Sequence, residues 1–308
     1  YPKNKTMIKN ARMYILVMIS ALGLSTLQSC KDDEGDGGTQ PTQSISQYLT
    51  SDGGYTEFLA ALDLAGLTGK ITGSGGYTIL AVSDLQLIDD GIDLSSMTNA
   101  EQVAFIKYHC IDGKKEPSDF TNTGYISSES NTGPGNAKLS IYTAVAGDAV
   151  RFNGKTATTN YEATNGMVYV MVNSLTVPSV LDQIANNPNL SNYKVGVNLE
   201  AATKTALETG DNTIFAINDT EFIKYLETQN VIRIADLSNS ARRALINNTI
   251  VLGDVKTTSQ LTGTISTEGE DITATSGADV TLNGTVKVIR GNVYASNGIM
   301  HVINGVLK

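Results

Sequence analysis

Hydrophobic and polar positions follow one order along the chain, and that order occurs twice. Residues 77–84 read Tyr-Thr-Ile-Leu-Ala-Val-Ser-Asp, and residues 212–219 read Asn-Thr-Ile-Phe-Ala-Ile-Asn-Asp. In each stretch a Thr precedes four consecutive apolar residues, which is typical of a short strand buried on both faces. Ser83 and Asn218 then stand three positions before a Gln and a Glu. This spacing predicts a capping box, so each strand should lead directly into a helix.

Apolar residues at helical spacing precede and follow the first of these strands. The pattern from residue 45 to residue 65 predicts short helices that end at Gly66. Thr98, with a Glu three positions later, predicts the start of another helix. This helix should carry Cys110 on its apolar face and should run to Gly113.

From about residue 138 the apolar period changes to two, as in β-strands. Asn-Gly pairs at 153–154 and 165–166 interrupt the alternation. Because Asn and Gly tolerate positive φ, these pairs predict tight hairpin turns. The first half of the chain should therefore place its helices first and an antiparallel sheet last.

The same order of elements returns after Pro178. The offset between matching residues is 135 at the strand, 140 at the second helical region and 132 at the last hairpin. Insertions in the loops between elements of fixed order produce such a drift. The predicted fold class is thus α+β, with two tandem domains at residues 45–178 and 179–308.

The N-terminal residues have the pattern of an export signal. Basic residues precede an apolar run, residues 14–27, which is too short for a comfortable membrane span. The run ends in Leu-Gln-Ser-Cys at residues 27–30, which resembles the lipobox of bacterial lipoproteins. We expect residues 1–29 to be a lipoprotein signal peptide, Cys30 to be acylated, and residues 30–44 to be a flexible tether. An ordinary signal that happens to end in Cys is the alternative.

The residues after Cys30 bear on localisation. Lys31-Asp32-Asp33-Glu34 is similar to the acidic tag that directs lipoproteins of Bacteroidota to the outer face of the outer membrane. We therefore expect a chain that is lipid-anchored in the outer membrane and exposed at the cell surface. These acids do not predict a calcium site, because Gln43 stands where a calcium-binding loop needs a bidentate Glu.

The charge balance and the cysteines exclude several classes of protein. Of the 22 basic residues, four precede Cys30, so the mature chain keeps 18 against 31 acidic residues, a formal charge of −13. This excess argues against nucleic acid and against electrostatic docking on anionic lipid. Cys110 is the only other cysteine, so there is no disulfide framework and no zinc cluster. In its apolar surroundings Cys110 is interpreted as a buried thiol.

Several motifs resemble those of the fasciclin domain family. Residues 78–81 and 213–216 resemble the family's first motif, residues 108–113 its Tyr-His motif, and residues 165–170 and 297–307 its closing hairpin. The chain is therefore similar to a tandem fasciclin-domain lipoprotein of the Bacteroidota type. The resemblance implies two compact domains, each a β-sandwich wedge with a helical layer, of a kind used in extracellular adhesion.

The resemblance makes Tyr108 and His109 the candidate partner-binding residues, because the Tyr-His segment of animal relatives has been implicated in receptor binding. The second half has Asn248-Thr249 at the matching place, so only the first half can inherit this role. The alternative is that both side chains are packed and hydrogen-bonded within the domain.

No catalytic site, metal site or cofactor is predicted. His109 and His301 lie in different halves, so a metal site or a Ser-His-Asp system could form around only one of them at a time. His301 alternates with apolar neighbours on a predicted strand and should lie on a sheet face. Arg242 and Arg243 are interpreted as a solvated helix face in an acidic chain.

The favoured hypothesis is a surface-anchored, non-catalytic adhesion or binding protein that contacts protein or glycan partners. The alternative is an accessory subunit of an outer-membrane nutrient (glycan) uptake complex, in which the domains hold a transporter or capture glycan for it. A hydrolase that depends on either histidine is the third hypothesis.

Overall fold

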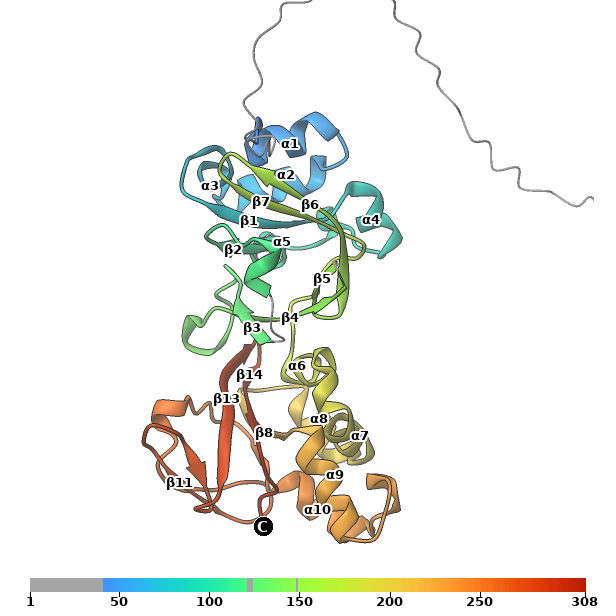
Figure 1. Cartoon of the computed structure of the whole chain (residues 1–308), viewed down its shortest axis with the longest axis vertical. Coiled ribbons are helices and arrows are strands. Elements are labelled where there is room, and N and C mark those ends of the chain that lie inside the picture. The colour runs from blue at the N-terminus through green and yellow to red at the C-terminus, as the bar shows by residue number, and fades with distance from the viewer. Residues whose placement is uncertain (1–40, 121–123, 148) are drawn as a thin grey trace, which may run out of the picture. The chain divides into compact units, whose positions relative to one another are not determined.

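The computed structural model describes residues 41–120, 124–147 and 149–308 (Figure 1). The predicted signal peptide, Cys30 and most of the predicted tether lie outside the described residues. Residues 41–308 form one compact unit with two separate hydrophobic cores. The buried members of one core run from Ile45 to Leu175 and those of the other from Val180 to Leu307. No helix within the described residues is long and apolar enough to cross a membrane.

The first copy places its helices before and after one central strand. The elements are α1 (Ile45–Asp52), α2 (Thr56–Leu64), α3 (Thr68–Thr72), β1 (Tyr77–Ala81), α4 (Asp84–Asp89), α5 (Asn99–Tyr108), β2 (Cys110–Asp112), β3 (Gly124–Ser127), β4 (Ser140–Ala146), β5 (Ala149–Phe152), β6 (Lys155–Ala163) and β7 (Gly166–Met171). The seven strands lie in the order β2-β1-β7-β6-β5-β4-β3.

The sheet of the first copy is mixed. β1 pairs antiparallel with β2 and parallel with β7, while the remaining neighbours are antiparallel. The predicted antiparallel sheet at the end of the domain is confirmed for β3 to β7. The parallel pairing of β1 with the last strand, β7, was not predicted. A register shift between Ala157 and Thr159 marks a bulge in β6, and bulges bend a strand.

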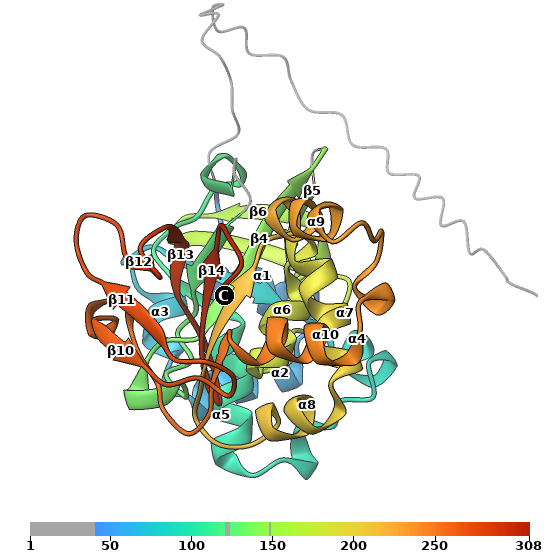
Figure 2. The ribbon, with the colours of Figure 1, turned by 90° about the horizontal axis from the view of Figure 1, so that it is seen from below.

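The second copy repeats this plan. Its elements are α6 (Val180–Asn186), α7 (Ser191–Leu199), α8 (Ala201–Leu207), β8 (Asn212–Ile217), α9 (Asp219–Thr228), α10 (Asn239–Asn247), β9 (Ile250–Val251), β10 (Gly263–Ile265), β11 (Ile272–Thr275), β12 (Thr281–Leu282), β13 (Val286–Ala295) and β14 (Gly298–Ile303). The strand order is β10-β11-β12-β13-β14-β8-β9, with β8 parallel to β14. Figure 2 shows α7, α9 and α10 grouped on one side and β10 to β13 on the other. The predicted α+β class with two similar domains is confirmed.

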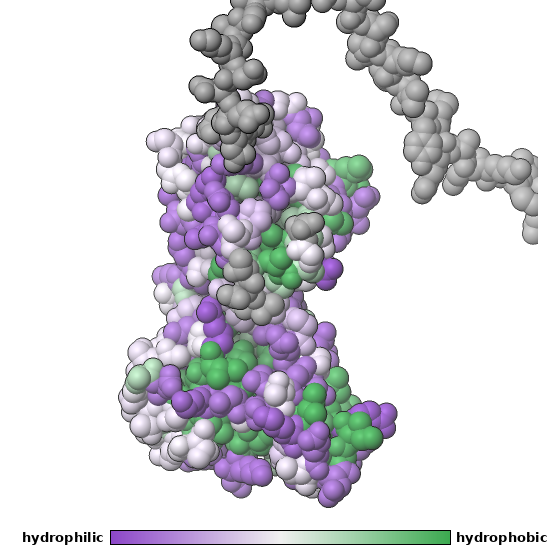
Figure 3. Space-filling view, in the orientation of Figure 1, coloured by the Kyte–Doolittle hydropathy of each residue, from purple (hydrophilic) through white to green (hydrophobic). Residues whose placement is uncertain are grey.

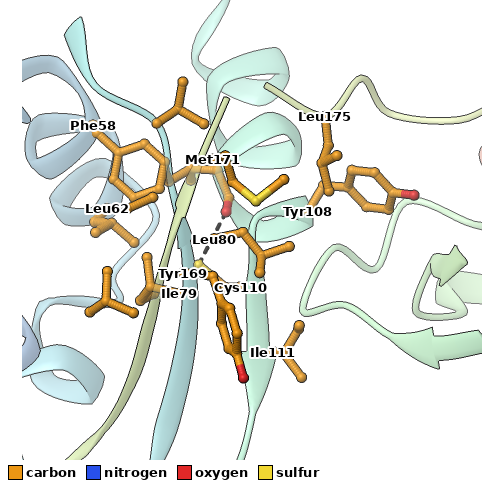
Figure 4. Packing of buried hydrophobic residues seen from close by; sticks show 14 of the residues in the cluster. Phe58, Leu62, Ile79, Leu80, Tyr108, Cys110, Ile111, Tyr169, Met171 and Leu175 are labelled. Atoms are coloured by element: carbon orange, nitrogen blue, oxygen red, sulfur yellow. Dashed lines mark hydrogen bonds between the residues drawn. The ribbon is translucent and has the colours of Figure 1, made fainter. Parts of the chain in front are cut away.

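The central strand is buried on both faces, as its run of apolar residues predicts. All five residues of β1 and all six of β8 are buried. Figure 4 shows Ile79 on the side of Phe58 and Leu62 from α2, and Leu80 on the opposite side of the sheet with Ile111. Strand alternation thus directs successive side chains into two layers of the same core.

The strand-to-helix corners are capped, although the predicted capping boxes are incomplete. The Ser83 hydroxyl accepts from the backbone N–H of Gln86 (3.2 Å), and the Asn218 carbonyl oxygen accepts from that of Glu221 (2.9 Å). The side chains of Gln86 and Glu221 do not bond back to the N-cap backbone N–H, as a capping box requires. Gln86 instead donates to Asp90, and Glu221 pairs with Lys224. The box at Thr98 is complete.

The helix predicted to run to Gly113 ends earlier than the helical spacing of its apolar residues indicates. α5 ends at Tyr108, and Cys110 lies on β2 rather than on the helix. Hydrogen bonding to β1 takes this segment out of the helix, since Ile79 pairs with Cys110. The matching residue pattern of the second copy ends in the same way, with Ile250 on β9.

Of the four Asn-Gly pairs at 153–154, 165–166, 283–284 and 297–298, which predict hairpin turns, two form such turns and two do not. Asn153-Gly154 and Asn283-Gly284 have positive φ at both residues. At 165–166 and 297–298 the Asn is the last turn residue and the Gly begins the strand. A Cβ on Gly166 would lie 1.8 Å from the carbonyl oxygen of Tyr77. This glycine therefore permits the close parallel approach of β7 to β1.

The surface is mostly polar, with smaller apolar patches on the face that Figure 3 shows. Apolar residues at helical spacing, Phe222, Ile223 and Leu226, predict the buried face of α9, but Ile223 is 48% exposed while the other two are buried. Ile88, which occupies the same place on α4, is 72% exposed. The apolar face of α9 is thus narrower than the sequence suggests.

Candidate functional site

The threonine of the repeated stretch holds the loop that follows the second strand of each domain. The Thr78 hydroxyl donates to the carbonyl oxygen of Gly113 (2.8 Å) and accepts from the N–H of Lys115 (2.9 Å). In the second copy, Thr213 donates to Asp254 (2.7 Å) and accepts from Lys256 (2.9 Å) in the same manner. Both hydrogen-bonding capacities of this buried hydroxyl are used inside the domain.

The aspartate of the repeated stretch caps a neighbouring helix. The Asp84 carboxylate accepts from the backbone N–H groups of Thr56 (2.9 Å) and Glu57 (3.0 Å), where α2 begins. The Asp219 carboxylate accepts from Ser191 (3.1 Å) and the next residue (2.9 Å), where α7 begins. A carboxylate at a helix N-terminus satisfies orphan donors and complements the helix dipole. These aspartates are therefore structural and are not available as catalytic carboxylates.

The asparagine of each closing hairpin holds the first helix of its own domain. Asn165 accepts from the N–H of Ile45 (2.8 Å) and donates to the carbonyl oxygens of Ile71 and Gly73 (both 2.8 Å). Asn297 accepts from the start of α6 and donates to the end of α8 in the second domain. The sequence indicates only a turn role for these asparagines, because hydrogen-bond partners up to 120 positions away leave no local signal.

Tyr108 and His109 are both inaccessible to solvent. The Tyr108 hydroxyl donates to the carbonyl oxygen of Ser140 (2.9 Å) and accepts from the Asn153 amide (2.8 Å). His109 donates from Nδ1 to Phe105 O (2.9 Å), and its Nε2 accepts from the N–H of a residue near the domain end (2.8 Å). Both side chains are packed and hydrogen-bonded within the domain, as in the alternative interpretation. A partner-binding role of this segment stays a prediction.

Burial keeps the His109 ring neutral. Desolvation lowers the pKa of His109 to about 4, against the weaker opposing effect of its bond to Phe105. The two ring nitrogens have fixed and opposite roles, one as donor and one as acceptor, so a single neutral tautomer fits the site. A proton-transferring base needs a free nitrogen near a substrate, and this ring offers none.

His301 is equally enclosed. Its Nε2–H donates to the carbonyl oxygen of Lys256 (2.8 Å), and Nδ1 accepts from the N–H of Asn292 (3.3 Å). The ring stacks on Phe215 at a centroid distance of 5.6 Å, and desolvation lowers the pKa of His301 to about 4. The expected position on a strand is confirmed, and this strand is buried along its whole length. Within the described residues no group of three or more His, Cys, Asp or Glu side chains could hold a metal ion.

Cys110 is a free, buried thiol, as interpreted from the sequence, although it lies on a strand. Its Sγ donates to the carbonyl oxygen of Ile106 (3.1 Å), and burial raises the pKa of the thiol. A protonated thiol without solvent access is a poor nucleophile.

The solvated helix face that the sequence suggests holds for Arg243 but not for Arg242. Both pair with Glu200, whose side chain is only 6% exposed, through Nε–Oε distances of 2.8 Å and 3.2 Å. The Arg242 side chain is itself 13% exposed, whereas that of Arg243 is 68% exposed. No local pattern in the sequence indicates Glu200, because it stands between α7 and α8 and only the packing of α10 against α7 brings the arginines to it.

A cavity of about 600 Å³ lies over this charged cluster. Alanines of α8, including Ala202 and Ala206, form part of its wall, and Thr203, Asn247 and Glu268 supply polar groups. The Thr203 hydroxyl donates to the side-chain carbonyl oxygen of Asn247 (2.9 Å). The volume falls within the range typical of small-molecule sites. This cavity, with Glu200 and its arginines, is the candidate binding site of the molecule.

These features describe two copies of one α+β domain, and comparison with known proteins gives the family. Residues 53–178 and 190–308 each match the model described as Fasciclin domain, and the chain belongs to this family. A search of curated proteins finds no match.

Among solved structures, the chain is similar to a FAS1 domain pair from the insect cell adhesion molecule Fasciclin I. The TM-score is 0.54 and the sequence identity is 18%, with 84% of this chain and 98% of that chain covered. At this identity the likeness shows the fold alone, as a tandem pair of fasciclin domains.

Proposed function

We propose that the chain is a surface-anchored, non-catalytic adhesion or binding lipoprotein that contacts protein or glycan partners through its two fasciclin domains. Family membership supports this proposal, as does the description of the insect relative as a cell adhesion molecule. The observation that carries it is the internal use of the polar groups that both copies share. Thr78, Asp84 and their counterparts make the same structural hydrogen bonds in each domain, and both histidine rings are fully bonded.

The proposed anchor is a lipid on Cys30. It rests on the basic residues, the apolar run and the Leu-Gln-Ser-Cys sequence at residues 27–30. Diacyl anchoring is stable, whereas a single chain holds a protein only marginally. The acidic residues 32–34 favour placement on the outer face of the outer membrane. The tether that follows would leave both domains free to reach a neighbouring surface.

The anchor and the adhesive role are tested together with one matched variant. Cells that express the full chain are compared with cells that express Cys30→Ser, which removes the acylated thiol but leaves both domains intact. We expect whole-cell protease and antibody accessibility, and adhesion to immobilised matrix proteins or glycans, to require Cys30. Equal adhesion by the two cell populations, or by cells without the chain, would refute the proposal.

The same cells distinguish the accessory-subunit alternative. The anchored chain is solubilised in mild detergent and its native mass is measured. A stoichiometric complex with an outer-membrane transporter, together with glycan uptake that fails when the chain is deleted, would replace the adhesion proposal. A chain that migrates alone and still supports adhesion favours the proposal as stated.

A further inference from the structure

The charged cluster beneath the cavity of the second domain is absent from the first. At the offset of the second helical region, Arg242 and Arg243 correspond to Gln102 and Val103. Gln102 donates to the carbonyl oxygen of Met97 (3.1 Å) and makes no ion pair among the described residues. The fold therefore does not require two arginines at this place. A buried ion pair is weak evidence for stability, so a cluster found in one copy only calls for another explanation.

Glu200 with its two arginines carries one excess positive charge, and Glu268 balances this charge over the lining of the cavity as a whole. Two guanidinium groups meet the single carboxylate of Glu200, which uses one oxygen for each arginine. Arg242 also donates from Nη2 to Asn239 (3.1 Å). Arg243, by contrast, uses only its Nε, and within the described residues its terminal nitrogens have no hydrogen bond or ion pair. Glu200 thus orients an exposed guanidinium whose two terminal nitrogens remain available at the cavity.

An oriented arginine with free terminal nitrogens matches a carboxylate. The planar fork can donate two parallel hydrogen bonds to the two oxygens of one carboxylate, which gives both energy and geometry. The surroundings of the cavity suit a ligand that also bears hydroxyls. The Asn247 carbonyl oxygen is occupied by Thr203, but its amide nitrogen has no partner among the described residues. Glu268, exposed at the rim, can accept from a hydroxyl.

The walls suit the apolar face of a sugar ring. Ala201, Ala202 and Ala206 line the cavity together with Leu199 and Leu252, and the polar groups stand beside this apolar surface. A saccharide ring needs such a surface together with a few fixed polar groups. We propose that this cavity binds a uronic-acid residue of an acidic glycan. Arg243 pairs with the sugar carboxylate, Asn247 bonds a ring hydroxyl, and Glu200 is a positioning residue for both arginines.

This inference rests on the proposed binding function and names its ligand class. It is tested by titrating the full chain, purified in detergent, with oligogalacturonate and with the neutral galactose oligomer of the same length. We expect the acidic oligomer to bind more tightly. Arg243→Gln should weaken its binding about tenfold or more, because a charge-assisted contact is lost. The affinity for the acidic oligomer should also fall as salt is raised.

Arg233→Gln is the matched control. Arg233 is also exposed, at 75%, and pairs with Asp236 away from the cavity, so its loss changes the net charge equally and should leave binding unchanged. A Glu200→Gln variant should weaken uronate binding as well, because the arginines lose their anchor. Retained folding of each variant is checked by hydrogen exchange in β14.

Four results would overturn the inference. They are an absence of uronate binding at millimolar concentration, equal affinity for the neutral oligomer, unchanged binding by Arg243→Gln, and tighter binding of an acidic peptide than of the uronate. The adhesion assay is independent of this one. Uronate binding that depends on Arg243 without cell adhesion would support the inference and refute the proposed function, whereas adhesion without uronate binding would do the reverse.

Discussion

The two domains solve the same structural problems with different side chains. In the first, the Tyr169 hydroxyl donates to the carbonyl oxygen of Lys115 (2.8 Å); in the second, His301 Nε2 donates to that of Lys256 (2.8 Å). Tyr169 and His301 occupy the same place on β7 and β14, at an offset of 132. Either a tyrosine or a histidine can supply the hydrogen-bond donor that reaches this carbonyl oxygen. A histidine at this position is therefore no sign of catalysis.

At the end of each domain, too, different residues make the hydrogen bond that holds the closing segment. In the first domain the N–H of Leu175 donates to His109, and in the second the Asn248 amide donates to the carbonyl oxygen of Leu307 (3.3 Å). The direction of the bond is reversed, but the closing segment is held to the end of the second helix in both. The comparison teaches that residues shared by both copies report on the fold. A residue present in one copy only can also serve the fold, as both histidines do. Glu200 with its arginines differs from them, because the uncharged Gln102 and Val103 stand at the places that match Arg242 and Arg243.

The largest expected effect comes from the glycines that admit the parallel strand pair. Gly166→Ala should destabilise the first domain on the order of 4 kcal/mol or more, because its Cβ would meet the Tyr77 carbonyl oxygen at 1.8 Å. Gly298→Ala should act likewise on the second domain, where the nearest backbone oxygen is 2.3 Å away. Denaturant-dependent hydrogen exchange in β7 and β14 reads the two domains separately.

Gly154→Ala is the control for that pair. Gly154 has a φ of +76° but no atom within 4 Å of the added Cβ, so only backbone strain remains and the loss should be about 1 kcal/mol. If Gly154→Ala and Gly166→Ala cost the same free energy of unfolding, the close approach of the strands is not what requires glycine.

The histidines give each domain its own pH dependence. The unfolded pKa is about 6.5, whereas that of His109 and His301 in the folded state is about 4. The unfolded chain therefore binds more protons between these values. Stability is full above about pH 6.5 and falls as the pH drops toward 4, by about 3 kcal/mol for each ring.

His301→Tyr sharpens this comparison, because it gives the second domain the residue of the first. The variant should lose the acid sensitivity of β14 between pH 6.5 and 4, while β7 keeps its own through His109. The measurement is the free energy of unfolding of each domain across this pH range. An unchanged slope in the second domain would mean that its acid sensitivity comes from other groups.

The loss of unfolding free energy on replacing a hairpin asparagine by alanine should increase with the number of hydrogen bonds that its side chain makes. Asn165→Ala leaves three backbone partners unsatisfied, and we expect a loss of about 3 kcal/mol from the first domain. Asn297→Ala leaves two and should cost the second domain about 2 kcal/mol. Chemical denaturation followed at α1 and α6 measures both losses, and an equal loss at the two sites would contradict the count of bonds.

The smallest effect on stability is expected at the residue with the largest proposed effect on binding. Arg243 is 68% exposed, and surface ion pairs contribute little, so Arg243→Gln should change the free energy of unfolding by about 1 kcal/mol or less. Thermal unfolding of this variant beside Val103→Ala, the change at the matching place in the first domain, checks the expectation. A loss of several kcal/mol at Arg243 would assign the cluster to the fold.

Local patterns in the sequence predicted much of the fold and little of the site. The duplication, the buried central strands, the caps at Ser83 and Asn218, and the family follow from spacings of a few residues, because capping and strand alternation are local interactions. The helix predicted to reach Gly113 was wrong because β1 competes for the same segment. The position of Cys110 on a strand follows from that competition.

By itself, the sequence determined that there are two similar α+β domains and which short elements they contain. Only the tertiary structure decided that Tyr108 and His109 are inaccessible, that Asn165 holds a helix 120 residues away, and that Arg242 and Arg243 meet a buried Glu200. The physical reason is that burial and ion pairing depend on which elements pack together. That choice is made by the whole core, and no window of neighbouring residues contains it.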